Sequence, residues 1–187
     1  DYIEAGTYAV AAAITGGSIT ISNLDQTDLN PILMPLKEFG INIQSEGNTI
    51  KVSGGKLKSM PELVTNVWPG FPTDLMSVAI VLATQCKGLT LCHDWMYESR
   101  MFFTDKLISM GAQINLADPH RVIVSGPAKL KGKTLETPDI RAGMALVLAA
   151  LIAKGTSVIN QSELIERGYE DVVEKLQSLG ADIERVV

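Results

Sequence analysis

Residues 141–155 read RAGMALVLAALIAKG, and this stretch decides the fold. It is almost wholly apolar and ends in glycine, which is typical of a buried helix closed by a glycine cap. Two earlier stretches have the same form: residues 11–17 read AAAITGG, and residues 81–88 read VLATQCKG. A β-rich segment follows each glycine, as in residues 18–22, SITIS. The sequence therefore predicts one helix–glycine–strand unit that is repeated three times.

A second glycine sets the frame of each copy. The two glycines of a copy lie 23, 23 and 25 residues apart, in the pairs Gly17–Gly40, Gly88–Gly111 and Gly155–Gly180. A one-faced helix is predicted before each second glycine, near residues 28–39, 100–110 and 163–179. We therefore predict a single α/β lobe of three βαβαββ-like units, approximately 1–70, 71–138 and 139–187. The units surround a pseudo-threefold axis, with apolar helices inside and sheets outside.

The third unit is predicted to be incomplete. Strands at 49–53 and 121–125 close hairpins in the first two copies, whereas the third copy reaches Val187 after its first strand. Because an unpaired sheet edge is a liability, we expect the absent strand to come from sequence outside these residues. The first residue is Asp1 rather than Met, and we expect upstream residues as well.

Composition limits the class of protein. The chain has 187 residues, 46% of them hydrophobic and 20% charged, which is enough to bury a substantial core. A net charge of −5 with no basic stripe argues against a nucleic-acid partner, and no apolar run is long enough to span a membrane. Cys86 and Cys92 are expected to be buried reduced thiols, which fits a cytoplasmic protein. His93 and His120 lack companions at ligand spacing, so we predict no metal, and no cofactor motif is present.

Charged residues follow the repeat. Asp74 and Arg141 both lie 14 residues before the first glycine of their copies, and Arg100 and Arg167 both lie 12 residues after it. If the units are related by threefold symmetry, the helix starts meet at one end, where an anion such as phosphate is favoured.

Structural roles remain open for the same residues. Asp139 can cap the helix with Arg141 folded onto it or onto another carboxylate, and Thr73 can cap a helix beside Asp74. Arg167 can be a solvated arginine near Glu166 and Glu170.

Five segments give the sequence its resemblance to a known family. DYIEAGTYAVAAAITGG, PGFPTDLMS, YESR, PDIRAGMALVLAALIAKG and ERGYEDVVEKLQSLGADIERV resemble the UDP-N-acetylglucosamine 1-carboxyvinyltransferase family of enolpyruvyl transferases, over all 187 residues. The resemblance implies an inside-out α/β barrel of two lobes, of which this chain is the C-terminal one. It implies transfer of the enolpyruvyl group of phosphoenolpyruvate to the 3′-hydroxyl of UDP-N-acetylglucosamine, the first step of peptidoglycan synthesis.

Site roles are implied by the same resemblance. Asp74 is the residue placed against the sugar hydroxyl, as base or proton relay, and Arg141 and Arg167 hold the phosphate and carboxylate of phosphoenolpyruvate. Arg100 and Asp139 help to close the cleft. Met96 offers a backbone contact near the uridine nucleotide.

The resemblance also implies what other sequence must supply. The family's catalytic loop, with cysteine or aspartate, lies in the other lobe, as do a lysine–asparagine pair and a further arginine, so this lobe alone is expected to be inactive. The family's N-terminal strand would complete the third unit. Family members often have arginine at the place of Tyr2, and some have histidine at the place of Trp68.

Two other functions stay open at this stage. The acceptor can be shikimate 3-phosphate instead, as in the related 3-phosphoshikimate 1-carboxyvinyltransferases. Alternatively, the repeats can form a binding module without chemistry, in which the arginines are solvated or paired.

Overall fold

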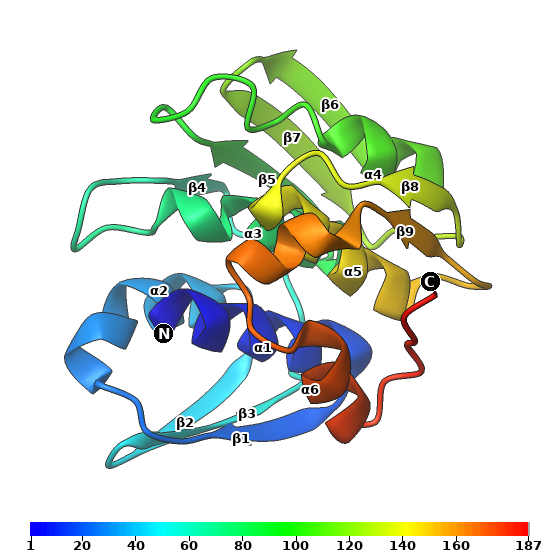
Figure 1. The fold of residues 1–187 in the computed structure, drawn as a ribbon. Helices are drawn as coiled ribbons and strands as arrows, with labels where there is room; N and C mark the ends of the chain where they lie inside the picture. The colour runs from blue at the N-terminus through cyan, green and yellow to red at the C-terminus, as the bar shows by residue number, and fades with distance from the viewer. Residues whose placement is uncertain (187) are drawn as a thin grey trace.

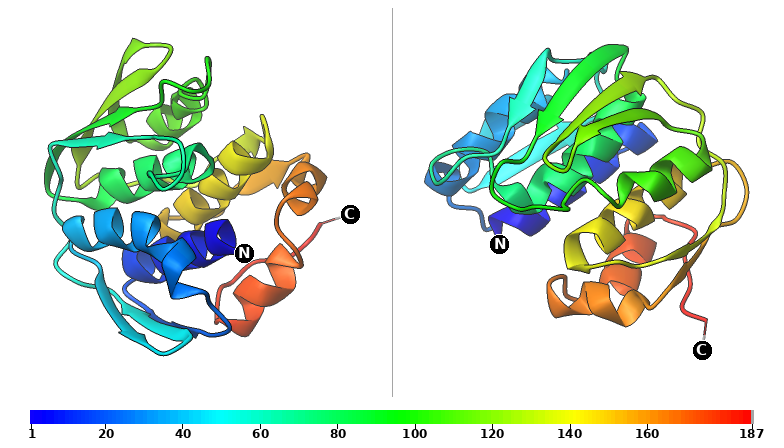
Figure 2. Two further views of the ribbon diagram at one scale, coloured as in Figure 1. Left: turned by 90° about the vertical axis from the view of Figure 1, so that its left-hand side faces the viewer. Right: turned by 90° about the horizontal axis from the view of Figure 1, so that it is seen from above.

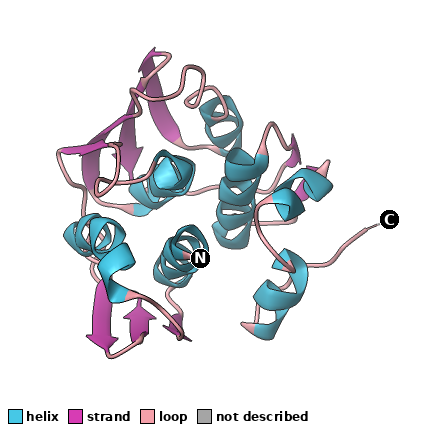
Figure 3. Cartoon of the chain, turned by 60° about the vertical axis from the view of Figure 1, so that its left-hand side comes forward, coloured by secondary structure: helices cyan, strands magenta, loops and turns pink. Residues whose placement is uncertain are grey.

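The computed structural model describes residues 1–186 and has a mixed α/β architecture, with helices inside and strands outside (Figures 1 and 3). The three inner helices are α1 (Tyr2–Thr15), α3 (Met76–Gln85) and α5 (Ile140–Ile152). Their burial explains their composition: in α3, every residue from Met76 to Thr84 is buried. A helix that is buried on all sides must be apolar on all sides, because an unpaired polar side chain there is costly.

The inner helices end differently from the prediction in two of the three copies. Gly16, with φ 70°, is the C-cap of α1, but Cys86 and Ala153 cap α3 and α5 in extended conformations. The glycine cap is therefore wrong for copies two and three. The backbone is extended directly after each of these helices, because the next residue forms a parallel β-bridge. Lys87 pairs with Lys58, and Lys154 pairs with Lys131.

Among residues 1–186, three separate sheets cover the helices. The first has the order β1 (Ser18–Ile21), β3 (Thr49–Ser53), β2 (Asn42–Glu46). The second has the order β4 (Glu62–Val64), β5 (Gly88–His93), β7 (Arg121–Gly126), β6 (Gln113–Asp118). The third pairs β8 (Thr134–Glu136) with β9 (Val158–Asn160). Both predicted hairpins, β2–β3 and β6–β7, are confirmed.

Copies two and three share a β–helix–β crossover, and the first strand of each crossover, β4 or β8, lies before residues 71 and 139, where the units were predicted to begin. β4 lies parallel to β5 with α3 between them in sequence, and β8 lies parallel to β9 with α5 between them. β4 and β8 are only three residues long, too short for a recognisable strand pattern in the sequence. These crossovers set where each inner helix begins, and they place that start beside the carboxyl end of the preceding strand.

The outer helices are α2 (Gln26–Glu38), α4 (Thr104–Met110) and, in the third copy, two short pieces. Those pieces are the 3₁₀ helix η2 (Ser162–Arg167) and α6 (Val172–Ser178), so the single helix predicted over 163–179 is wrong. Two features lie at the break, one a tertiary contact and one a backbone conformation. A Cβ on Gly168 would lie 2.6 Å from Ile140 Cγ2, and Asp171 has a left-handed φ of 47°.

The end of the third copy also differs from the prediction. Residues 181–186 form no strand, although Asn42–Glu46 and Gln113–Asp118 do so after the second glycine of their copies. Those two strands pair with β3 and β7, and the part of the chain that the structure describes offers no such partner to 181–186. Val187 lies outside the described residues. A strand supplied by other sequence stays a prediction.

The core contains both cysteines as free, buried thiols, which confirms that prediction. Burial raises the pKa of Cys86 and that of Cys92 to about 12. Within residues 1–186, none of the helices has the length and apolar character that crossing a membrane requires.

Candidate active site

The starts of the inner helices gather at one end of the molecule (Figures 2 and 3). Asp74 lies in η1 (Thr73–Leu75), the 3₁₀ turn that leads into α3, and Arg141 is the second residue of α5. Arg141 Nη2 lies 2.7 Å from Asp74 Oδ2, which is the length of a charge-assisted hydrogen bond. At the start of α1, the ring of Tyr2 is 5.8 Å from that of Trp68. The repeat therefore brings together the equivalent residues of copies two and three.

A second guanidinium faces the same carboxylate. Arg100 Nη2 lies 3.7 Å from Asp74 Oδ1, and its side chain is only 12% exposed, whereas that of Asp74 is 37% exposed. Asp74 therefore gives one oxygen to Arg141 and keeps the other beyond hydrogen-bond distance of Arg100. That second oxygen can accept a proton or a hydrogen bond from a ligand.

Arg141 is held from behind by Tyr169. The Arg141 guanidinium carbon lies 5.3 Å from the centre of the Tyr169 ring, in cation–π range. The Tyr169 hydroxyl is 3.0 Å from Thr7 Oγ1, and the Thr7 hydroxyl donates to Ile3 O, so Tyr169 is the donor to Thr7. Burial raises the pKa of Tyr169. This contact connects the third copy to α1 and fixes the ring on which Arg141 rests.

Two capping predictions have different outcomes. Asp139 is the N-cap of α5, and its Oδ1 accepts hydrogen bonds from Arg141 N at 2.8 Å and Ala142 N at 2.9 Å, which confirms the cap. The guanidinium of Arg141 turns to Asp74 instead of Asp139. Thr73 as a helix cap is wrong: η1 has no side-chain cap, because the Thr73 hydroxyl donates to Asp94.

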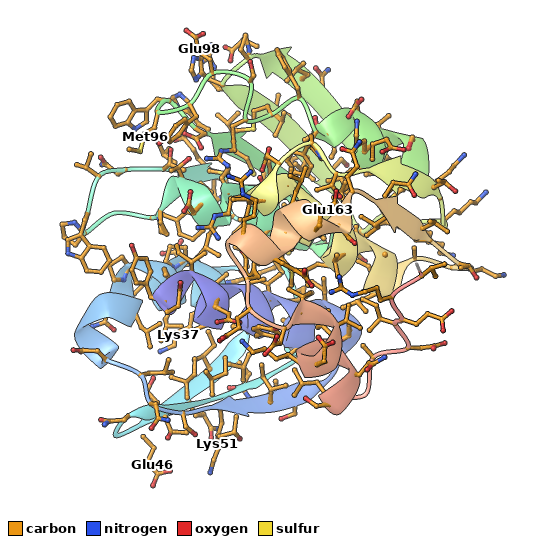
Figure 4. The ribbon with its side chains drawn as sticks, viewed as in Figure 1. Lys37, Glu46, Lys51, Met96, Glu98 and Glu163 are labelled. Carbon is orange, nitrogen blue, oxygen red and sulfur yellow. The ribbon has the colours of Figure 1, made fainter. Side chains whose placement is uncertain are left out.

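Arg167 and Met96 lie at the edges of this arrangement. Arg167 is the last residue of η2 and is exposed, and within the described residues its side chain has no hydrogen bond or ion pair. The next residue, Gly168, packs against Arg141, since a Cβ there would lie 3.4 Å from Arg141 Nη1. Met96 projects from the loop after β5, on the far side of the molecule from Glu46 (Figure 4). The Met96 amide already donates to Asp94, so its carbonyl is the backbone group left for a ligand.

Arg100 and Asp139 share a hollow at the surface, whose lining also includes Ser99, Lys106 and Pro138. Arg100 lies four residues before α4, not inside the helix predicted from residue 100. The hollow brings the loop before α4 next to the start of α5. Both residues that were expected to close a cleft therefore lie on one surface.

Sequence reasoning missed Asp94. This residue has 0% exposure and accepts hydrogen bonds from Thr65, Thr73 and the Met96 amide. The available signal was an acid placed directly after an apolar strand, in LCHDW at residues 91–95. His120 contacts the same residue, with Nδ1 2.7 Å from Asp94 O. Among residues 1–186, no group of three or more His, Cys, Asp or Glu side chains is placed to hold a metal ion.

The arrangement has a definite chemical character. One carboxylate stands between two guanidinium groups, and Asp74 and Arg141 lie at the starts of inner helices, which is an environment suited to binding anions. The Oδ1 atom of Asp74 has no hydrogen bond from the described residues. A carboxylate in this setting can also act as a proton acceptor towards a bound hydroxyl.

Comparison with known proteins gives one family. A family model described as EPSP synthase (3-phosphoshikimate 1-carboxyvinyltransferase) matches residues 1–176. The chain is 47% identical to the UDP-N-acetylglucosamine 1-carboxyvinyltransferase of Bradyrhizobium diazoefficiens, with 100% of this chain and 45% of that protein covered. It is 45% identical to the same-named protein of Treponema denticola, with 98% of this chain and 45% of that protein covered. The chain thus spans about half the length of the curated relatives that it matches.

Solved structures agree in fold. The enolpyruvyl transferase NikO from Streptomyces tendae matches with a TM-score of 0.87 at 25% identity, over 98% of this chain and 44% of that chain. An EPSP synthase from Acinetobacter baumannii matches with a TM-score of 0.77 at 20% identity, over 99% of this chain and 46% of that one. The second likeness concerns the fold alone.

Proposed function

The chain belongs to the EPSP synthase family, and we propose that it is one lobe of a UDP-N-acetylglucosamine 1-carboxyvinyltransferase. Relatives with that name are 41–47% identical to it, whereas the matched EPSP synthase structures are 18–20% identical. The observation that carries the proposal is the contact between Asp74 and Arg141 at 2.7 Å, because it joins a carboxylate and a guanidinium from two copies at the helix starts.

The proposed reaction moves the enolpyruvyl group of phosphoenolpyruvate to the 3′-hydroxyl of UDP-N-acetylglucosamine. The hydroxyl oxygen forms a bond to C2 of phosphoenolpyruvate and loses its proton, while C3 gains one. The resulting tetrahedral intermediate then loses a proton from C3 and expels inorganic phosphate, which restores the double bond. In this scheme Asp74 faces the sugar hydroxyl, and its free Oδ1 is the atom placed to accept that proton.

The arginines would supply the positive charge that binds phosphoenolpyruvate, the donor of the enolpyruvyl group. Phosphoenolpyruvate has two anionic groups, and Arg141 and Arg167 are proposed to hold its phosphate and carboxylate. A guanidinium has five N–H donors, so Arg141 can bind Asp74 and an anion together. Arg167 has no partner among the described residues, so it is free to bind a ligand. Arg100 and Asp139 would then close over the hollow that they share, and Met96 would offer its carbonyl to the nucleotide.

The rest of the site is proposed to lie outside this chain. The chain spans about 45% of the length of its relatives, so a second lobe would be present in the complete protein. By the family resemblance, that lobe would supply a catalytic loop, a lysine–asparagine pair and a further arginine. We therefore propose that these residues alone do not catalyse the reaction. The complete enzyme would act in the cytoplasm, at the start of peptidoglycan synthesis, without a cofactor.

A second acceptor has one observation in its favour. The matching family model is described by 3-phosphoshikimate 1-carboxyvinyltransferase, so shikimate 3-phosphate is the alternative acceptor. The percentage identities favour the nucleotide sugar. A binding module without chemistry is disfavoured, because the relatives named above are transferases.

Phosphate release decides between these possibilities. The full-length gene product that carries this chain should release phosphate from phosphoenolpyruvate when UDP-N-acetylglucosamine is added. Shikimate 3-phosphate should give no release above background. Release with shikimate 3-phosphate alone would overturn the acceptor, and silence with both would favour the binding module.

A further inference from the structure

We propose that Asp94 is a positioning residue for this reaction, and that its buried carboxylate holds Arg100 and the turn carrying Asp74 in place. The inference rests on the proposed function, because it assigns Asp94 to the site formed by Asp74 and Arg141. Asp94 follows β5 directly and is absent from the contacts that we assign to substrates.

The contacts of the Asp94 carboxylate include two elements of the site. Its Oδ1 accepts hydrogen bonds from Thr65 Oγ1 at 3.1 Å and from the Met96 amide at 3.0 Å. Its Oδ2 accepts a hydrogen bond from Thr73 Oγ1, and Thr73 is the neighbour of Asp74 in η1. One carboxylate therefore fixes both the turn with the proposed proton acceptor and the loop with the proposed nucleotide contact.

The Oδ2 atom of Asp94 also faces Arg100. Arg100 Nε lies 3.8 Å from Asp94 Oδ2, and its Nη2 lies 3.7 Å from Asp74 Oδ1. Among the described residues, this buried Nε has no hydrogen-bond partner. A shift of less than about 1 Å would bring it within hydrogen-bond distance of Asp94. Asp94 thus balances the charge of Arg100 from the protein side and leaves Asp74 Oδ1 free for the substrate.

The repeat shows that the fold does not require an acid here. The residues equivalent to Asp94 are Asn23 in the first copy and Gln161 in the third, and both are exposed amides. Both have left-handed backbones, with φ of 59° and 56°. Only the copy that carries Asp74 buries a carboxylate at this place. Burying a charge is costly unless it is paired, so a role beyond folding accounts for it better.

Other contacts fix the backbone at Asp94 and at Thr65. His120 Nδ1 lies 2.7 Å from Asp94 O, and the Asp94 amide donates to His120 O at 2.9 Å. Trp95 Nε1 donates to Thr65 O at 2.7 Å, which fixes the threonine that donates to Asp94. A group fixed on this many sides suits precise placement, since a displacement of about 1 Å at a reacting centre can cost about 100-fold in rate.

The third copy offers a matched control. Thr65 follows β4 and donates its hydroxyl to Asp94, whereas Thr137 follows β8 and donates its hydroxyl to Asn160 O at 2.8 Å. Both threonines are buried, at 0% and 2% exposure. Thr65→Val and Thr137→Val therefore remove a similar buried hydrogen bond in two places, and only the first touches the Asp94 network.

The test uses the full-length protein, with the variants Asp94→Asn, Thr65→Val and Thr137→Val. The first readout is the NMR signal of the Arg100 Nε–H group, assigned with Arg100→Lys, which needs no activity. The second readout is kcat and KM for both substrates. We expect Asp94→Asn to lower kcat about 100-fold with a smaller change in KM, and to speed solvent exchange at Arg100. Thr65→Val should act in the same direction, and Thr137→Val should change neither readout.

Several outcomes would overturn the assignment. They are a kcat of wild-type size in Asp94→Asn, an unchanged Arg100 signal in an inactive Asp94→Asn protein, or an equal loss in Thr137→Val. If Asp94→Asn does not fold, Thr65→Val decides by the same criteria. If the wild type releases no phosphate with either acceptor, the proposed function fails, while the Arg100 signal still tests the positioning.

Discussion

The second and third copies of the repeat have the same backbone plan and different chemistry. Each runs from a short strand through an inner helix to a parallel strand, β4–α3–β5 or β8–α5–β9. At the helix start the second copy has Asp74 and the third has Arg141, and the two side chains form an ion pair. The shared plan builds the apolar core, and the positions where the copies differ build the candidate site.

The sheets of the two copies also differ. The second copy has a four-stranded sheet, whereas the third has only β8 and β9 among the described residues. The two inner helices differ in burial as well: every residue from Met76 to Thr84 is buried in α3, whereas in α5 burial extends from Ala142 to Ala149 and the last three residues are only partly buried. The less complete sheet therefore accompanies a less buried end of its inner helix. That end lies away from the helix start, where the candidate site is located.

Replacing the Asp74 carboxylate of the second copy should have the largest effect on turnover. Asp74→Asn keeps the shape of the side chain but cannot accept the hydroxyl proton, so kcat of the full-length protein should fall about 10²- to 10⁴-fold. Phosphate release measures this. Asp118→Asn is the control, because Asp118 pairs with Arg121 on the β6–β7 hairpin. Turnover within about threefold of wild type in Asp74→Asn would exclude Asp74 as the proton acceptor.

Removing the Arg141 guanidinium of the third copy should have the next largest effect on the kinetics. Arg141→Ala should raise KM for phosphoenolpyruvate about 100-fold, because a charge-assisted contact contributes up to about 3 kcal/mol. Arg167→Ala should act in the same direction. Steady-state kinetics check both, with Arg121→Ala as the exposed control. An unchanged KM and kcat in both variants would contradict an arginine clamp.

Alanine substitutions at the second glycine of each copy test how much these positions contribute to the free energy of unfolding. Gly40, Gly111 and Gly180 have φ of 88°, 109° and 94°, so alanine is strained at each. A Cβ on Gly40 would also lie 2.3 Å from Lys56 O, whereas Gly180 has open space. Gly40→Ala should therefore lower the free energy of unfolding by about 2 kcal/mol or more, and Gly180→Ala by about 1 kcal/mol. Urea unfolding measures both, and equal losses would show that close packing at Gly40 does not matter.

The cysteines should give the smallest effect. Burial raises the pKa of Cys86 and that of Cys92 to about 12, while an unfolded thiol has a pKa of about 8.5. The unfolded state therefore loses protons first, and the free energy of unfolding should fall by about 0.2 kcal/mol per thiol by pH 8. A thiol reagent at pH 8 should label neither cysteine until urea is added. Rapid labelling of the folded protein would contradict burial of the thiols.

The parts of the fold that follow from local pattern were predictable. Apolar helices that end near glycine at a fixed period identified α1, α3 and α5, and equal spacing placed Asp74 and Arg141 at equivalent positions. The structure brings those two side chains together, as threefold symmetry required. Periodicity works here because each copy buries the same helix in the same way.

The parts that depend on tertiary contacts were not predictable. The helix expected over 163–179 breaks because Gly168 packs against Ile140, and residues 181–186 lack a strand partner. Thr73 looked like a cap, but its hydroxyl is taken by Asp94, which is 21 residues away in sequence. No local pattern contains information about a partner at that distance. The position of Asp94 directly after a strand was visible in the sequence, but its contacts with Thr65 and Thr73 were not.

A crystal structure of the full-length protein with phosphoenolpyruvate would test the central claim most directly. That claim is that copies two and three form one anion site with their different charges. We expect phosphate or carboxylate oxygens within about 3 Å of the guanidinium groups of Arg141 and Arg167, with Asp74 beside the bound molecule. Phosphoenolpyruvate bound away from the helix starts, with the Arg141–Asp74 pair in contact with no ligand, would contradict the claim.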